Sequence, residues 1–239
     1  AGVTGHMTFS TGAATSGASG AILLNTGAAA NGVSGGFHVS LGTSSTDIGG
    51  DIRMDAGVSS VKTGGAVQIA SGFGTAHSSG ALILRTANGG TSGVSGIMTF
   101  ASGTTSSGAS GSVTLASGSA TGGKGGDIKL SVGTGTADVG GNLFGSSGVS
   151  NAETGGHVSL STGAGTATSS GAVVVKTAGG GSNGVSGRMA FSTGAATSGS
   201  SGKISFATGS ASAGRSGDIS LAGGAATGNT GGDIIFNAG

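Results

Sequence analysis

Short segments that alternate apolar and polar residues recur along the whole chain. The first apolar residue of each segment returns at a spacing of 15 residues, beginning with Met7 and Ile22. The series continues through Phe37, Ile52, Val67, Leu82, Met98, Val113, Ile128, Leu143, Val158, Val173, Met189, Ile204, Ile219 and Ile234. Only the intervals from 82 to 98 and from 173 to 189 differ, each being 16 residues long. The pattern therefore defines 16 consecutive repeats, and such internal periodicity governs any prediction of the fold.

A longer period is superimposed on this repeat. Six repeats and one inserted residue make 91 residues, and residues 2–9 return with few changes at 93–100 and at 184–191. The inserted residue falls at matching places, within 87–90 and within 178–181. We therefore interpret 1–239 as one continuous domain of three modules, 2–92, 93–183 and the partial module 184–239, without a linker.

The alternation predicts extended segments, because a period of two places every second side chain on the same face of a strand. Gly flanks each segment and permits the corners that a folded-back chain requires. A helix is disfavoured, since Gly in a helix interior costs about 1 kcal/mol per residue. Collagen would need Gly at every third position and abundant Pro. The sequence thus predicts an all-β fold, a single continuous β-solenoid of 16 coils with about 15 residues per coil.

Composition narrows the function classes. Gly accounts for 58 of 239 residues, Pro, Cys and Trp are absent, and only 7% of residues are charged. Disordered chains are rich in charge and Pro, so we expect order. The net charge of +1 is spread over single residues, which argues against a nucleic-acid partner and an anionic membrane surface. No apolar run reaches the length of about 18 residues that a membrane span requires.

Candidate chemical groups are few. Asp51, Asp127, Asp218 and Asp233 each precede the first apolar residue of a repeat. Asp218 and Asp233, on adjacent coils, are weak candidates for a cation site because hard cations take oxygen ligands. The alternative is a set of polar corner residues facing water near Lys124 or Arg215. The four His residues form no regular cluster. We therefore expect no enzyme activity, no catalytic residues, no cofactor and no established metal site.

In a solenoid the first and third residues of each alternating segment, such as Ile22 and Met54, would face inward, and the middle residue would face outward. At five repeats this residue is large and apolar, namely at Leu23, Ile83, Phe144, Val174 and Ile235. The feature returns in the sixth repeat of two modules (Ile83, Val174). Exposed apolar side chains at regular places indicate a lateral contact with another chain. The sequence thus predicts self-association.

With this Gly-rich repeat, the chain resembles Gly/Ser/Thr-rich β-solenoid proteins of cell-surface or extracellular fibres, including adhesin-like proteins. The resemblance implies a structural module of a long fibre, located outside the cell or at its surface. One alternative is the shaft of an adhesin. Another is an ice-binding (antifreeze) β-solenoid, which the chain resembles less closely because its outward column mixes Thr with other residues. Abundant Ser and Thr would accept O-linked glycans, whereas no Asn-x-Ser/Thr sequon is present.

Overall fold

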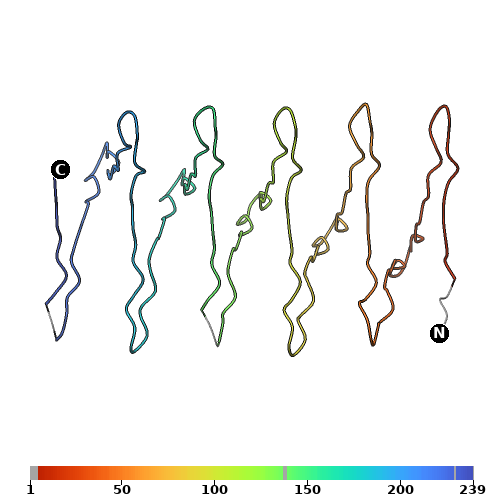
Figure 1. The fold of residues 1–239 in the computed structure, drawn as a ribbon, viewed down its shortest axis with the longest axis horizontal. Helices are drawn as coiled ribbons and strands as arrows, with labels where there is room; N and C mark the ends of the chain where they lie inside the picture. Colours follow the sequence, from red (N-terminus) through yellow and green to blue (C-terminus); the bar gives the residue numbers. More distant parts are fainter. Residues whose placement is uncertain (1–4, 137–138, 229, 239) are drawn as a thin grey trace. The chain divides into compact units, whose positions relative to one another are not determined.

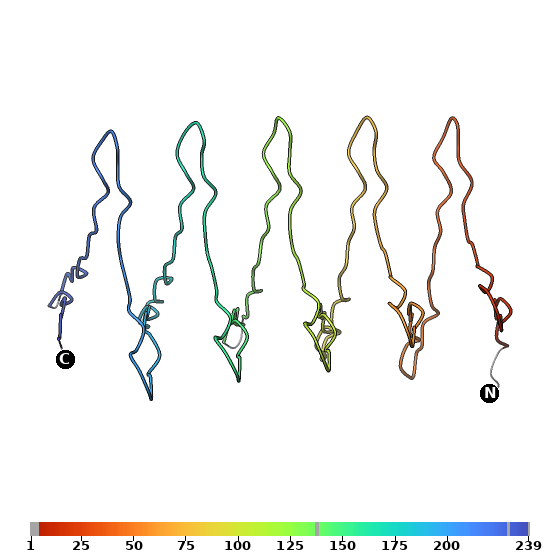
Figure 2. The same ribbon diagram turned by 90° about the horizontal axis from the view of Figure 1, so that it is seen from above.

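The backbone is built of extended segments, here called arms, joined by narrow bends (Figure 1, Figure 2). The computed structural model describes residues 5–136, 139–228 and 230–238. Within these ranges the backbone forms neither helix nor β-strand. The prediction of an all-β solenoid with 16 stacked coils is therefore wrong, and the term β-solenoid does not describe this molecule.

The bends follow the sequence repeat. They lie at 15–17, 30–32, 45–47, 60–62, 75–77, 91–92, 106–108, 121–123, 151–153, 166–168, 182–184, 197–199, 212–214 and 227–228, with a further bend residue at 136. Each bend falls about nine residues after the first apolar residue of its repeat, as at Ser16 after Met7. The bends at 75–77 and 91–92 begin 16 residues apart instead of 15, because the inserted residue lies between them. Each repeat up to the one that begins at Ile219 therefore forms one arm and one bend.

Serine hydroxyl groups close several bends. The hydroxyl of Ser59 accepts a hydrogen bond from the backbone N–H of Lys62 at 2.9 Å, and Ser44 accepts one from Asp47 at 3.0 Å. Ser150 accepts from the N–H of Glu153 at 2.9 Å, which is the same contact as at Ser59 one 91-residue period later. Such side-chain-to-backbone bonds are the reason why Ser favours turns. The bends are thus specified locally, by residues three positions apart.

A glycine closes the far side of each bend. This glycine lies two residues before the next repeat's first apolar residue. It faces the side chain located nine residues earlier, or ten where the extra residue is inserted, except at Gly232, which faces the backbone of Gly224. At Gly20 a Cβ atom would lie 3.3 Å from the Cβ of Thr11, and at Gly141 it would lie 2.7 Å from a methyl carbon of Val132. The same relation holds at Gly35, Gly50, Gly65, Gly80, Gly96, Gly111, Gly126, Gly156, Gly171, Gly187, Gly202 and Gly217. The glycine is needed because the two arms approach closely there.

The 91-residue period also appears in the backbone conformation. Positive φ angles occur at Gly17 (93°), Gly108 (93°) and Gly199 (101°), which are spaced 91 residues apart. Backbone hydrogen bonds obey the same period, since Gly65 N donates to Gly57 O at 2.8 Å and its counterpart pair, Gly156 and Gly148, is bonded at 2.9 Å. Successive modules therefore share a local conformation at these positions, whereas the positive φ of Gly122 (80°) has no counterpart at its equivalents Asn31 and Ala213.

The absence of a sheet in the described residues has a simple geometric cause. Outside the bends a sheet would need successive N–H···O=C bonds between arms, as in any strand ladder. The backbone bonds found instead join glycines across one bend at a time, as from Gly80 N to Gly72 O at 3.0 Å. Where such a bond is present, it is a single bond at the base of one bend and does not continue into a ladder, so the arms stay extended but unpaired in the described residues.

The chain divides into two compact units, Ala1–Ala116 and Ser117–Gly239. The division falls inside the second sequence module. It also falls between two glycine contacts, since Ser102 faces Gly111 in the first unit and Ser117 faces Gly126 in the second. Each unit therefore contains only complete bend contacts.

Candidate assembly surface

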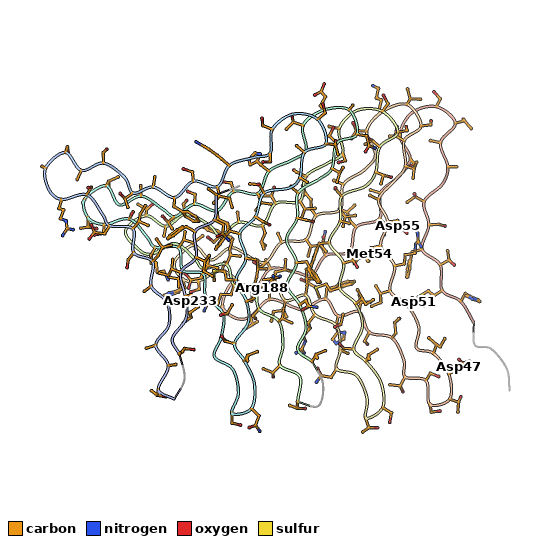
Figure 3. All side chains as sticks on the ribbon, turned by 60° about the vertical axis from the view of Figure 1, so that its left-hand side comes forward. Asp47, Asp51, Met54, Asp55, Arg188 and Asp233 are labelled. Carbon is orange, nitrogen blue, oxygen red and sulfur yellow. The ribbon has the colours of Figure 1, made fainter. Side chains whose placement is uncertain are left out.

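The apolar residues of the arms form the most extensive chemical feature of the surface. Among the residues that the structure describes, no side chain is buried. The expectation that the first and third residues of each alternating segment point into a core is therefore wrong. Met54, which was expected to face inward, is 70% exposed, and it lies along an open arm together with Asp51 and Asp55 (Figure 3). The arms consequently present apolar side chains to the surroundings.

The order of exposure nevertheless follows the sequence pattern. In the second repeat, Ile22 is 52% exposed and the middle residue Leu23 is 73% exposed. In the twelfth repeat, Val173 is 59% exposed and the middle residue Val174 is 76% exposed. In these two arms the middle position is the more exposed, whereas in the last repeat Phe236 (83%) is more exposed than the middle residue Ile235 (73%).

The five predicted lateral-contact residues all lie at arm centres. Their side chains are 73–87% exposed, with Phe144 the most exposed. These residues are Leu23, Ile83, Phe144, Val174 and Ile235. The lateral contact itself remains a prediction.

Two neighbouring arms meet through aromatic rings at one place. The rings of Phe191 and Phe206 lie with their centroids 6.4 Å apart and their planes at 87°. This edge-to-face arrangement is favourable because the positive edge of one ring meets the negative face of the other. The pair was not singled out from the sequence, although both residues occupy the third position of consecutive alternating segments. Equal positions in successive repeats can thus approach each other across a bend.

Two ion pairs repeat with the 91-residue period. Lys124 Nζ lies 2.8 Å from Asp127 Oδ1, and Arg215 Nη2 lies 2.9 Å from each carboxylate oxygen of Asp218. All four side chains are largely exposed, so each pair contributes less than about 1 kcal/mol. A further exposed pair joins Arg53 to Asp55, with Nη2 3.2 Å from Oδ1. These pairs place positive charges directly beside carboxylates at two of the positions considered for cations.

The weak cation candidates Asp218 and Asp233 differ in their surroundings. The carboxylate of Asp218 already binds the guanidinium of Arg215, whereas Asp233 has no hydrogen bond or ion pair to any described residue. No group of three or more His, Cys, Asp or Glu residues converges in the described part of the molecule. Cations such as Ca²⁺ take six or more oxygen ligands, and the structure does not bring such a set together here.

A shallow hollow of about 310 Å³ lies where the inserted residue enlarges the sixth repeat. Arg85, Thr86, Ala87 and Asn88 line it, which makes it mostly polar. The corresponding residues one period later are Lys176, Thr177, Ala178 and Gly179, so a positive charge recurs at this place. The insertion is visible in the sequence, whereas the hollow is not.

In the described residues, no helix has the length and apolar character needed to cross a membrane. Comparisons with protein-family models, curated proteins and solved structures found no match.

Proposed function

We propose that the chain is a structural module that assembles with further copies of itself into a fibre outside the cell or at its surface. One observation carries the proposal. The chain exposes 23299 Å², whereas a folded monomer of this mass exposes about 9,200 Å². An ordered molecule whose large apolar side chains are 43–99% exposed to water is stabilised when another molecule covers them.

The excess area also favours many neighbours over one. It amounts to about 14,000 Å², while a standard protein interface buries about 1,200–2,000 Å² and large permanent ones about 5,000 Å². A closed dimer would leave most of the excess in water. Repeated heterologous contacts, in which each copy contacts several others, generate open filaments. A fibre therefore fits the surface better than a small oligomer does.

The charge distribution supports association between identical chains. With a net charge of +1, two copies repel each other weakly, because self-repulsion grows with net charge. Within the described residues, three ion pairs neutralise charges of the molecule itself. The middle positions Leu23 and Val174 provide exposed apolar contacts on the arms. Identical copies are thus free to approach with their arms side by side.

The test is a dilution series of the purified protein, followed by sedimentation velocity and electron microscopy. We expect monomer at low concentration and filaments above a critical concentration. A protein that remains monomeric and soluble throughout the series would refute the proposal. In native material, continuous filaments support the fibre, and single stalks bearing heads support the adhesin shaft.

The same proposal includes O-linked glycans on the bends. The bends are rich in Ser and Thr, and Ser16, Ser60 and Thr197 are exposed there. Surface hydroxyls of this kind are accessible to modifying enzymes. Intact-mass measurement of native material tests this part, because an unmodified mass would contradict it without affecting the assembly experiment.

A further inference from the structure

The same five-residue sequence occurs at two bends of the molecule. Residues 31–35 and 183–187 both read Asn-Gly-Val-Ser-Gly. Asn31 lies in the bend at 30–32 and Asn183 in the bend at 182–184, and both side chains are exposed. No hydrogen bond joins either side chain to another described residue. The two sites therefore match in local sequence and in access to water.

The two sites differ in the backbone nitrogen that follows the asparagine. The N–H of Gly184 donates a hydrogen bond to the carbonyl of Gly181 at 3.1 Å, which closes a turn around Asn183. The equivalent turn one period earlier, from Gly93 N to Gly90 O, is bonded at 3.3 Å. The N–H of Gly32 has no hydrogen-bond partner among residues 5–136, 139–228 and 230–238. The backbone N–H of Gly32, next to Asn31, thus has no hydrogen bond within the described residues, whereas that of Gly184, next to Asn183, has one.

We propose that Asn31 is a site of spontaneous deamidation and that the closed turn protects Asn183. In this reaction the backbone nitrogen of Gly32 loses its proton to solvent base and attacks Cγ of Asn31. A bond forms between that nitrogen and Cγ, the bond from Cγ to Nδ2 breaks, and the leaving Nδ2 group takes up a proton and departs as ammonia. Water then opens the resulting five-membered imide at either carbonyl, which gives aspartate or isoaspartate. No electrons are exchanged, and water is the only co-reactant.

Glycine at position 32 favours this reaction because it has no Cβ to obstruct the approach to Cγ and has wide backbone freedom. In Asn183 the same attack first requires the Gly184–Gly181 bond to break. A net hydrogen bond of about 1 kcal/mol corresponds to a rate about fivefold lower. The inference does not depend on fibre assembly, since it concerns one bend of a single molecule.

The experiment follows both sites in the same molecule. The intact protein is incubated below its critical concentration in mildly alkaline buffer, digested with trypsin and analysed by tandem mass spectrometry. Trypsin cleaves after Arg53, Lys176 and Arg188, so it releases residues 1–53 with Asn31 and residues 177–188 with Asn183. Fragment ions separate Asn31 from Asn25 within the first peptide.

Synthetic peptides covering residues 28–37 and 180–189 provide the reference rate for each site, and these include the different preceding residues Ala30 and Ser182. We expect Asn31 to react in the intact protein at nearly its peptide rate. Asn183 should react about fivefold more slowly than its own peptide, the factor of one net hydrogen bond. In an Asn31→Gln variant the deamidated form of the tryptic peptide 1–53 that arises at this site should disappear.

Equal ratios of protein rate to peptide rate at the two sites would overturn the inference, as would a lower ratio at Asn31. Full protection of both sites in the intact protein would also overturn it, because the bend at 30–32 would then restrain Gly32 as strongly as the turn restrains Gly184.

Discussion

At the scale of single residues, glycine has distinct tasks in this protein. At Gly20 it allows a close approach to Thr11, whose hydroxyl also donates a hydrogen bond to the Gly20 carbonyl at 3.1 Å. At Gly108 it adopts a positive φ of 93°, and its carbonyl accepts a bond from the Thr105 hydroxyl at 2.8 Å. Substitution by alanine should therefore have effects that depend on the position.

The first prediction concerns the close approach at Gly20. In Gly20→Ala the new methyl group would lie 3.3 Å from the Cβ and methyl carbons of Thr11, tighter than ordinary van der Waals contact, so the two arms should separate at this bend. The measurement is the nuclear Overhauser contact between the Thr11 methyl group and residue 20, which should weaken. Gly27→Ala is the control, because a Cβ at Gly27 meets no described atom within 4 Å. An unchanged contact in Gly20→Ala would show that the glycine is not needed for closure.

The second prediction concerns the positive φ at Gly108. In Gly108→Ala, an L-residue would be forced into a conformation that costs about 1–2 kcal/mol. The bend should relax to negative φ, and the bond from Thr105 should be lost. The three-bond coupling between the amide and α protons of residue 108 measures φ directly. Gly103→Ala should leave its own bend unchanged, because Gly103 is not a positive-φ position and a Cβ there meets no described atom within 4 Å. A coupling that still corresponds to positive φ in Gly108→Ala would contradict this account.

At the scale of elements, the positions of arms and bends could be predicted from the sequence, whereas their pairing could not. The alternation of apolar and polar residues indicates an extended backbone, and Gly and Ser between the segments indicate bends. Both signals are local, and the bends at Ser59 and Ser150 are indeed closed by contacts within four residues. A ladder of backbone hydrogen bonds forms only when neighbouring arms lie close enough together. The alternating pattern does not determine that distance. The solenoid prediction failed at this step.

The third prediction compares amides at the bases of bends. The N–H groups of Gly65 and Gly156 donate backbone hydrogen bonds, whereas that of Gly35 has no partner among the described residues. In the unassembled protein, hydrogen exchange at Gly65 and Gly156 should be about fivefold slower than at Gly35, relative to unstructured peptides of the same sequence. Amide exchange resolved by NMR provides the measurement. Equal exchange at the three glycines would mean that the bond from Gly65 to Gly57 does not persist in solution.

At the scale of the whole molecule, the candidate surface was only partly predictable. The exposed middle residues, such as Phe144, follow from the position in the repeat. The exposure of Met54 and Ile22 does not, because their burial was inferred from a core that requires paired arms. The Phe191–Phe206 contact depends on the geometry of one particular bend. The sequence therefore identified which residues are apolar and regularly placed, but assigned too many of them to an interior.

The fourth prediction tests the arms as the surface of assembly. Val174→Thr replaces a methyl group by a hydroxyl at an arm centre, which should be covered in the fibre. An unpaired buried hydroxyl costs about 1–3 kcal/mol, so the critical concentration should rise about tenfold. Val58→Thr makes the same change beside a bend, where the side chain is 99% exposed, and should have little effect. Sedimentation across a dilution series measures both variants. An equal change of the critical concentration in both variants would show that the arm centres do not form the contact between copies.

The contacts that close each bend never extend beyond the adjacent repeat. Thr11 faces Gly20, Thr26 faces Gly35, and no described glycine of this set depends on a more distant partner. Removing or adding one complete repeat therefore leaves every remaining contact intact and creates junctions of a kind already present. Unequal recombination within the coding sequence can thus lengthen or shorten such a protein in whole repeats without loss of local structure. A change in the number of repeats therefore leaves the contacts within each remaining bend unchanged.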